Sequence, residues 1–200
     1  MFKQSSNEAF IEKVSSLCMY IEHENIWISA VVLNKDYAVT VLHIVPECYR
    51  QLGFLVILCD TRQQMHKAHI HGLNNKSDYV VFKKDDGVFD DAPDMVAPET
   101  LDKYIVVGFA FGEKKPSICA GHVSSLSTGS RGFFYGDSGD LPGFNGGGVF
   151  YSKNGALLGI ARGSDWEGKE TKQYGDVLEM ISAQLIAHDI EIFNDQPFSV

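Results

Sequence analysis

The sequence has few basic residues. Its 200 residues include 17 Lys and Arg against 26 Asp and Glu, which gives a formal net charge of −9 at pH 7. The basic residues are scattered along the chain and form no cluster. Because nucleic-acid binding depends on clustered positive charge facing the phosphates, we expect no nucleic-acid partner.

The sequence also lacks a long hydrophobic run. A helix that spans a bilayer needs about 20 consecutive apolar residues, and no segment approaches that length. The N-terminal residues MFKQSSNEAFIEKV do not show the basic stretch followed by an apolar stretch that marks a secretory signal. The sequence therefore predicts a cytoplasmic protein with no membrane partner.

Cysteine is sparse, and no C-x-x-C pair is present. This spacing excludes a dense disulfide scaffold and does not indicate a zinc site, so the sequence predicts free and mostly buried thiols. His69 and His71 share one face of a predicted strand, but no third metal ligand is recognisable. We expect neither a metal nor another cofactor. The four cysteines are Cys18, Cys48, Cys59 and Cys119.

The sequence does contain many short apolar segments. Hydrophobic residues make up 44% of the chain, which is enough to build a substantial core. Between Trp27 and Ile160, segments such as IWISAVVL, FLVILC and YIVVGFA alternate with turn residues. Short runs rich in β-branched and aromatic residues predict an all-β barrel or sandwich, with a hairpin turn at Asn154-Gly155.

Two segments outside this region have the spacing of amphipathic helices. The first has Ser6 as a candidate N-cap and apolar residues at Phe10, Ile11, Val14 and Leu17. The second is the tail, with apolar residues at Val177, Met180, Ile181, Leu185 and Ile186. We expect the second helix to pack on the last barrel.

Three segments carry residue types that are used in nucleophilic catalysis. AVTVLHIV carries His43 close to the end of a predicted strand, and NNKSDYVVFKK places Asp78 directly before a strand. PGFNGGGVFYSKNGALLGI is a glycine-rich turn followed by a hairpin. In this order and spacing they resemble the three active-site segments of the trypsin-like serine proteases. The stretch YIVVGFAFGEKKPSICAGHVSSL is similar to the opening of the second barrel in the high-temperature-requirement branch of that family.

The resemblance implies an all-β fold of two six-stranded chymotrypsin-like β-barrels, with short N-terminal and C-terminal helices. It divides the chain into five parts. These are an N-terminal helix or extension at 1–24, the first barrel at 25–92, a linker at 93–100, the second barrel at 101–175, and a C-terminal helix and tail at 176–200.

The resemblance also implies roles for the site residues. In such proteases a histidine accepts the proton of a serine hydroxyl, and an aspartate orients the histidine. These residues would be His43 and Asp78, and Asn145 would stand at the position of the nucleophile. The backbone N–H groups of Gly143 and Asn145 would form the oxyanion hole.

The edge of the substrate groove would lie at Ala161, Arg162 and Gly163. Two orientations of Arg162 remain open. Turned inward, its side chain would pair with a carboxylate of the bound ligand. Turned outward, it would be a solvated surface charge.

The GDSG sequence at residues 136–139 offers Ser138 as an alternative nucleophile. Ser138 lies 21 residues before Gly159 in the following hairpin, whereas Asn145 lies 14 residues before it. The shorter separation matches the short hairpin of the resembled family. The spacing therefore favours Asn145 at the nucleophile position.

Asparagine cannot replace a nucleophilic serine, because its amide lone pair is delocalised and its oxygen has no proton to give to His43. The sequence predicts a catalytically inactive pseudoprotease that binds an extended peptide or a protein segment. Two alternatives stay open. One is an active serine endopeptidase, either inactivated by a Ser-to-Asn change at position 145 or using Ser138. The other is a structural subunit whose groove is filled. The sequence does not indicate the oligomeric state.

Overall fold

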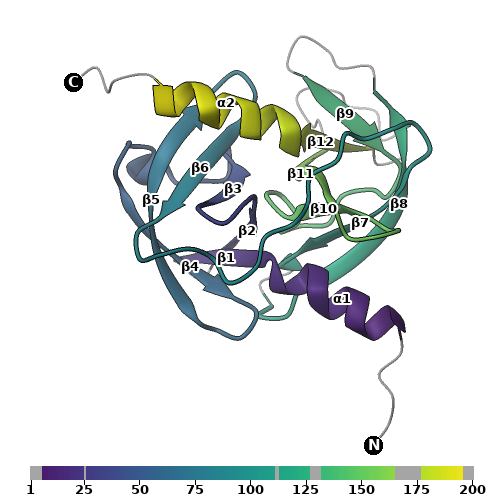
Figure 1. The fold of residues 1–200 in the computed structure, drawn as a ribbon, viewed down its shortest axis with the longest axis horizontal. Helices are drawn as coiled ribbons and strands as arrows, with labels where there is room; N and C mark the ends of the chain where they lie inside the picture. The colour runs from purple at the N-terminus through teal and green to yellow at the C-terminus, as the bar shows by residue number, and fades with distance from the viewer. Residues whose placement is uncertain (1–5, 25, 111–112, 127–131, 165–176, 196–200) are drawn as a thin grey trace, which may run out of the picture.

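The chain forms two closed antiparallel β-barrels that lie beside each other (Figure 1). The structure is a computed structural model, and it describes residues 6–24, 26–110, 113–126, 132–164 and 177–195. Each barrel has six strands, and one helix lies near each end of the described chain. The predicted all-β fold with two six-stranded barrels and two short helices is confirmed.

The first barrel has the strand order β1-β2-β3-β6-β5-β4. Its strands are β1 (Cys18–His23), β2 (Ile26–Val32), β3 (Tyr37–Val41), β4 (Leu55–Asp60), β5 (Met65–Asn74) and β6 (Tyr79–Lys84). Exposed and buried side chains alternate at the start of β4, as expected for a strand with one face on the core. In contrast, β3 is buried along its whole length, because it also contacts β11 of the second barrel.

The second barrel has the strand order β10-β11-β12-β9-β8-β7. Its strands are β7 (Lys103–Gly108), β8 (Ser117–Ser125), β9 (Phe133–Gly136), β10 (Gly148–Tyr151), β11 (Leu157–Gly163) and β12 (Leu178–Ser182). The predicted turn at Asn154-Gly155 connects β10 to β11, with Gly155 at a φ of +78°. A helix of one turn, η1 (Glu47–Tyr49), follows β3 in the first barrel.

The structure corrects the expected start of the C-terminal helix. Residues Leu178–Ser182 form β12, which pairs with β11 on one side and β9 on the other, and helix α2 (Ala183–Asp195) starts only at Ala183. The apolar residues Met180 and Ile181 therefore belong to the barrel core. The apolar spacing in this short segment fits both a helix and a strand, and pairing with the edges of two neighbouring strands favours the strand.

The expected boundaries of the two barrels also differ from the observed elements. Strand β1 belongs to the first barrel although it lies before residue 25, and β12 belongs to the second barrel although it lies after residue 175. The boundary at 175 itself falls within 165–176, outside the described residues.

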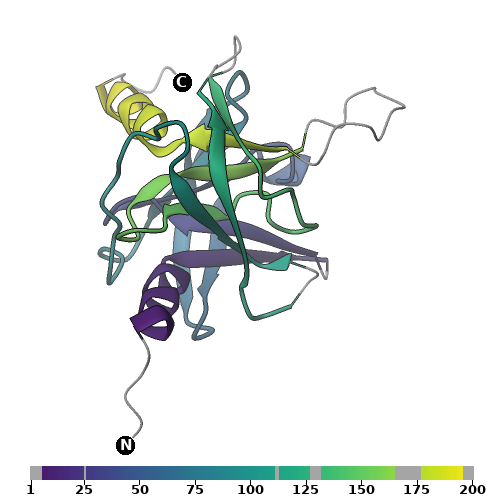
Figure 2. The ribbon, with the colours of Figure 1, turned by 90° about the vertical axis from the view of Figure 1, so that its right-hand side faces the viewer.

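The two helices tie the barrels together crosswise. Helix α1 (Ser6–Ser16) precedes the first barrel, yet Phe10 and Val14 pack over Gly155 in the β10–β11 hairpin of the second barrel. Helix α2 follows the second barrel, yet Asp189 accepts hydrogen bonds from Tyr79 and Asn74 of the first barrel. Figure 2 shows both helices on the same side of the molecule, at its two ends.

The described helices are too short and too polar for one of them to cross a membrane. All four cysteines are free thiols. Only Cys18 is fully buried, while Cys48 is exposed and the other two are intermediate, so the prediction of mostly buried thiols is wrong. Cys48 is exposed because it lies in the surface turn η1 rather than in a barrel strand.

Candidate active site

His43 and Asp78 meet between the ends of two paired strands of the first barrel. His43 lies just after β3, Asp78 lies just before β6, and β3 and β6 pair in antiparallel register up to Val41 and Tyr79. Nδ1 of His43 is 2.7 Å from Oδ2 of Asp78, and the backbone N–H of His43 donates to Oδ1 at 3.0 Å. The carboxylate therefore holds both the ring and the backbone of His43.

Asp78 adopts the left-handed backbone conformation, with a φ of +59°. Its side chain is buried, whereas 41% of the His43 side chain is exposed. Aspartate tolerates this backbone region better than most residues, but the conformation still costs about 1 kcal/mol or more. The surrounding contacts hold Asp78 there, including the bond from the Leu42 N–H to its carbonyl at 3.0 Å.

Asn145 reaches the opposite side of the His43 ring. Its Nδ2 lies 3.2 Å from Nε2 of His43. Because an amide NH₂ can only donate, this contact is a hydrogen bond in the tautomer whose Nε2 carries the lone pair and whose Nδ1 carries the proton that bonds to Asp78. A carboxamide therefore occupies the space in front of Nε2.

The loop that carries Asn145 has two N–H groups that no backbone carbonyl of the described residues accepts. Within it, the N–H groups of Phe144, Gly146 and Gly147 donate to backbone carbonyls at 2.7 to 2.9 Å. In the part of the chain that the structure describes, the N–H groups of Gly143 and Asn145 have no such acceptor. These two are the N–H groups that the resemblance assigned to the oxyanion hole.

Gly143 and its loop are fixed against both barrels. A Cβ at Gly143, where φ is +99°, would lie 2.5 Å from the carbonyl oxygen of Phe109, so glycine is required. The carbonyl of Gly143 accepts a hydrogen bond from the Ser29 hydroxyl at 2.6 Å, and Ser29 accepts one from the Phe109 N–H at 2.8 Å. Ser29 of β2 thereby joins the first barrel to this loop of the second.

Ser138 is held by Tyr104. The Tyr104 hydroxyl donates to Oγ of Ser138 at 2.9 Å and accepts from its N–H at 3.1 Å, while Oγ of Ser138 donates to the Gly139 carbonyl at 3.0 Å. The structure therefore brings Asn145 to His43 and brings Ser138 to a buried tyrosine of β7 instead.

The residues expected at the groove edge lie on β11 beside Asn145. Ala161 is buried, and its carbonyl accepts the Gly146 N–H at 2.7 Å. Gly163 approaches Asn145 so closely that a Cβ on Gly163 would lie 2.9 Å from Oδ1 of Asn145. These contacts place the end of β11 against the Asn145 side chain.

Arg162 takes the inward one of the two orientations that the sequence left open, but with partners that sequence reasoning missed. Its side chain turns inward and is mostly buried, and its Nε donates to Oδ2 of Asp78 at 2.8 Å. Its Nη1 donates to Glu179 of β12, and its guanidinium lies 4.8 Å from the ring centroid of Phe133. Two carboxylates of the protein itself thus engage the guanidinium that was expected either to meet a ligand or to face solvent.

The pKa of the Asp78 carboxyl is held below its ordinary value of 3.8. Burial alone would raise this pKa, but the hydrogen bonds from His43 and the charge of Arg162 outweigh burial. Burial likewise disfavours the charge on Arg162, yet Asp78 and Glu179 raise the pKa of its guanidinium. Asp78 and Arg162 are therefore both charged at neutral pH.

Glu179 and Ser29 are the contributors that the sequence did not reveal. Glu179 stands in the apolar run VLEMIS and is 4% exposed, so a buried carboxylate requires a cation nearby. This need for a cation could have indicated the pair from the sequence, because Arg162 is likewise a lone charge in a buried strand. Ser29 gave no comparable signal.

The described residues contain no group of three or more His, Cys, Asp and Glu side chains that could hold a metal ion. His69 and His71 lie near each other, with ring centroids 6.3 Å apart. His69 pairs with Asp85, and Nε2 of His71 pairs with Asn194 of α2.

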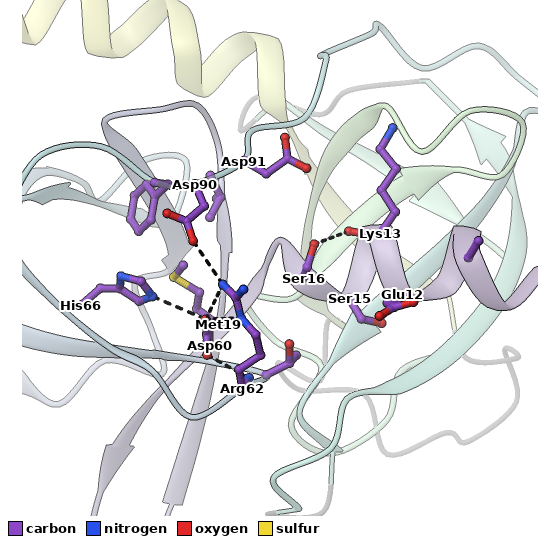
Figure 3. A pocket seen from close by; sticks show the side chains of 14 residues that line it. Glu12, Lys13, Ser15, Ser16, Met19, Asp60, Arg62, His66, Asp90 and Asp91 are labelled. Carbon is purple, nitrogen blue, oxygen red and sulfur yellow. Dashed lines mark hydrogen bonds and ion pairs between the residues drawn. The ribbon is translucent and has the colours of Figure 1, made fainter. Parts of the chain in front are cut away.

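A separate cavity of about 510 Å³ opens beside helix α1 (Figure 3). Figure 3 shows Arg62 between Asp60 and Asp90, with His66 beside Asp60. The lining residues include none of those gathered around His43. This cavity is therefore distinct from the candidate active site.

Comparison with known proteins bears on the fold and the family of the chain. The crystal structure of a serine endoprotease from Yersinia pestis superposes on this chain with a TM-score of 0.75. The superposition covers 97% of this chain and 69% of the endoprotease chain. The sequence identity is 19%, so this likeness concerns the fold. A search of curated proteins found no match. The family model described as "Trypsin-like peptidase domain" matches residues 28–160, more than half of the chain. The chain therefore belongs to the trypsin-like peptidase family.

Proposed function

We propose that this protein is a pseudoprotease, a member of the family that binds an extended peptide or protein segment and does not cleave it. The observation that carries the proposal is the contact between Nδ2 of Asn145 and Nε2 of His43 at 3.2 Å. Cleavage by this family's mechanism needs a hydroxyl at that place, whose proton moves to the histidine as its oxygen attacks. A carboxamide has no such proton and no comparable nucleophile.

Features needed for recognition are present at the same site. The unpaired N–H groups of Gly143 and Asn145 can donate to a peptide carbonyl. The end of β11, at Arg162 and Gly163, offers backbone beside which an extended segment can align as an added strand. Peptide binding uses these backbone groups and does not require a nucleophile.

The experiment measures binding and cleavage together. Fluorescently labelled decapeptides of random sequence are titrated with the protein, and the recovered peptides are examined by mass spectrometry. We expect saturable binding of a subset of sequences and intact peptides. Peptide fragments, or no binding to any sequence, would contradict the proposal.

Two variants locate the binding. Asn145→Trp puts a large side chain against His43 and Gly163, so binding should weaken by about tenfold or more. Arg62→Ala changes the separate cavity beside α1 and should leave binding unchanged. Equal binding by Asn145→Trp and wild type would show that the peptide binds elsewhere.

A second candidate is an active serine endopeptidase in which a Ser-to-Asn change at position 145 has removed the nucleophile. The intact hydrogen bonds between His43 and Asp78 favour it. Under this alternative, Asn145→Ser alone would give full peptide hydrolysis. Catalysis by Ser138 has less support, because Ser138 would first have to leave Tyr104.

A further inference from the structure

We infer that Arg162 is a positioning residue that weakens the support Asp78 can give to His43 during proton transfer, so that the site is silenced a second time, independently of Asn145. The inference rests on the proposed function, because it concerns the same site. It goes further by assigning a role to the ion pair between Arg162 and Glu179, which acts on His43 through Asp78.

The first step is the sharing of one oxygen. Oδ2 of Asp78 accepts the hydrogen bond from Nδ1 of His43 at 2.7 Å and also the bond from Nε of Arg162 at 2.8 Å. A histidine that takes a proton becomes an imidazolium, and an adjacent aspartate assists by stabilising that charge. Here the carboxylate already faces a permanent cation at the same atom.

The second step is burial. The side chains of Asp78, Arg162 and Glu179 are 12%, 15% and 5% exposed, so water screens their interaction weakly. The cation contacts Asp78 directly, while its own counter-ion Glu179 binds a different nitrogen of the guanidinium. Because the cation itself touches Oδ2, Glu179 offsets the effect of Arg162 on Asp78 only in part.

The third step is that Arg162 is not required to fix Asp78. Oδ1 of Asp78 already accepts the backbone N–H of His43 at 3.0 Å, and Oδ2 accepts the ring. Among the described residues, the charged Arg50 also contacts this segment, and its Nη2 donates to the His43 carbonyl at 3.2 Å, away from the ring. Arg162 is thus the cation that acts on the dyad through Asp78.

The test uses a serine-directed fluorophosphonate with variants that carry a hydroxyl. In Asn145→Ser, the introduced hydroxyl oxygen attacks phosphorus, the P–F bond breaks, fluoride leaves with the bonding electrons, and the hydroxyl proton passes to Nε2 of His43. The labelling rate is measured from pH 5 to pH 9. Asn145→Ser/His43→Ala gives the rate without the base.

The decisive comparison adds Arg162→Met and Glu179→Gln to Asn145→Ser, which removes the cation together with its counter-ion. We expect the rate on the alkaline plateau to rise by about an order of magnitude and the pH midpoint of labelling to move upward, because Asp78 then stabilises the imidazolium fully. Asn145→Ser/Arg162→Lys keeps the charge and should stay as slow as Asn145→Ser. A purely structural role would not separate these two variants.

Three results would overturn the inference. They are equal plateau rates with and without the ion pair, an equal gain in the Lys variant, and no labelling above the His43→Ala control in either variant. Should the Met variant not fold, Arg162→Gln/Glu179→Gln replaces it. The proposed function is tested on the wild-type chain by peptide binding and peptide integrity, so either idea can fail without the other.

Discussion

The ion pair between Arg162 and Glu179 makes a testable prediction about stability. Arg162→Met removes the cation and leaves Glu179, whose side chain is 5% exposed, as a buried carboxylate without its partner. Breaking a buried pair in this way costs about 3–5 kcal/mol of unfolding free energy. Lost packing of the guanidinium against Phe133 contributes to the same cost.

Adding Glu179→Gln to Arg162→Met should restore part of that stability. The carboxamide is neutral, so the uncompensated charge disappears, and we expect the double variant to be about 2 kcal/mol more stable than Arg162→Met alone. Glu179→Gln by itself should cost about 1–2 kcal/mol, because Arg162 keeps Asp78 as a partner.

Urea unfolding at pH 7, followed by tryptophan fluorescence, measures all four members of this cycle. We predict that Glu179→Gln raises the unfolding free energy of the Arg162→Met variant. Additive destabilisation, with the double variant less stable than either single variant, would refute the assignment of Arg162 and Glu179 as a buried coupled pair.

Three further predictions concern other parts of the molecule. The pKa of Asp78 is lowered in the folded state, so the stabilisation by its carboxylate is fully present above the ordinary pKa of 3.8 and is lost as the pH falls through the lower folded value. The unfolding free energy measured below a pH of about 4 should therefore depend less on pH in Asp78→Asn than in wild type. Gly146→Ala would place a Cβ 2.1 Å from a backbone oxygen of the first barrel and should cost about 3 kcal/mol or more, whereas Gly87→Ala, with nothing within 4 Å, should cost only about 1–2 kcal/mol in thermal unfolding for its positive φ. Burial raises the pKa of the Cys18 thiol to about 12, so iodoacetamide at pH 8 should modify the exposed Cys48 and spare Cys18, as peptide mapping would show.

The sequence predicts the fold well because each strand is locally encoded. Short β-branched and aromatic runs separated by turn residues allow few other architectures. The exception is β12, where residues 178–182 fit a helical period equally well. Its pairing with β11, the preceding strand, and with the more distant β9 decides the outcome. A reading of local periodicity has no access to that pairing.

In the candidate site, too, some residues can be located from local sequence and others only from the tertiary structure. His43, Asp78 and Asn145 can be located by motif and spacing, and the structure brings the three side chains into contact. The link from Asp78 to Arg162 and Glu179 depends on how two barrels approach each other and on the register of β11 against β12. No local pattern in the sequence contains that information.

The most direct test of the account is the reaction of the wild-type protein with a fluorophosphonate, followed by intact-mass measurement. Because a carboxamide stands before Nε2 of His43 and Ser138 is held by Tyr104, we predict that the mass does not change, while Asn145→Ser gains one adduct. A single adduct on the wild-type chain, mapped to Ser138 or to another serine, would contradict the claim that the site has no nucleophile.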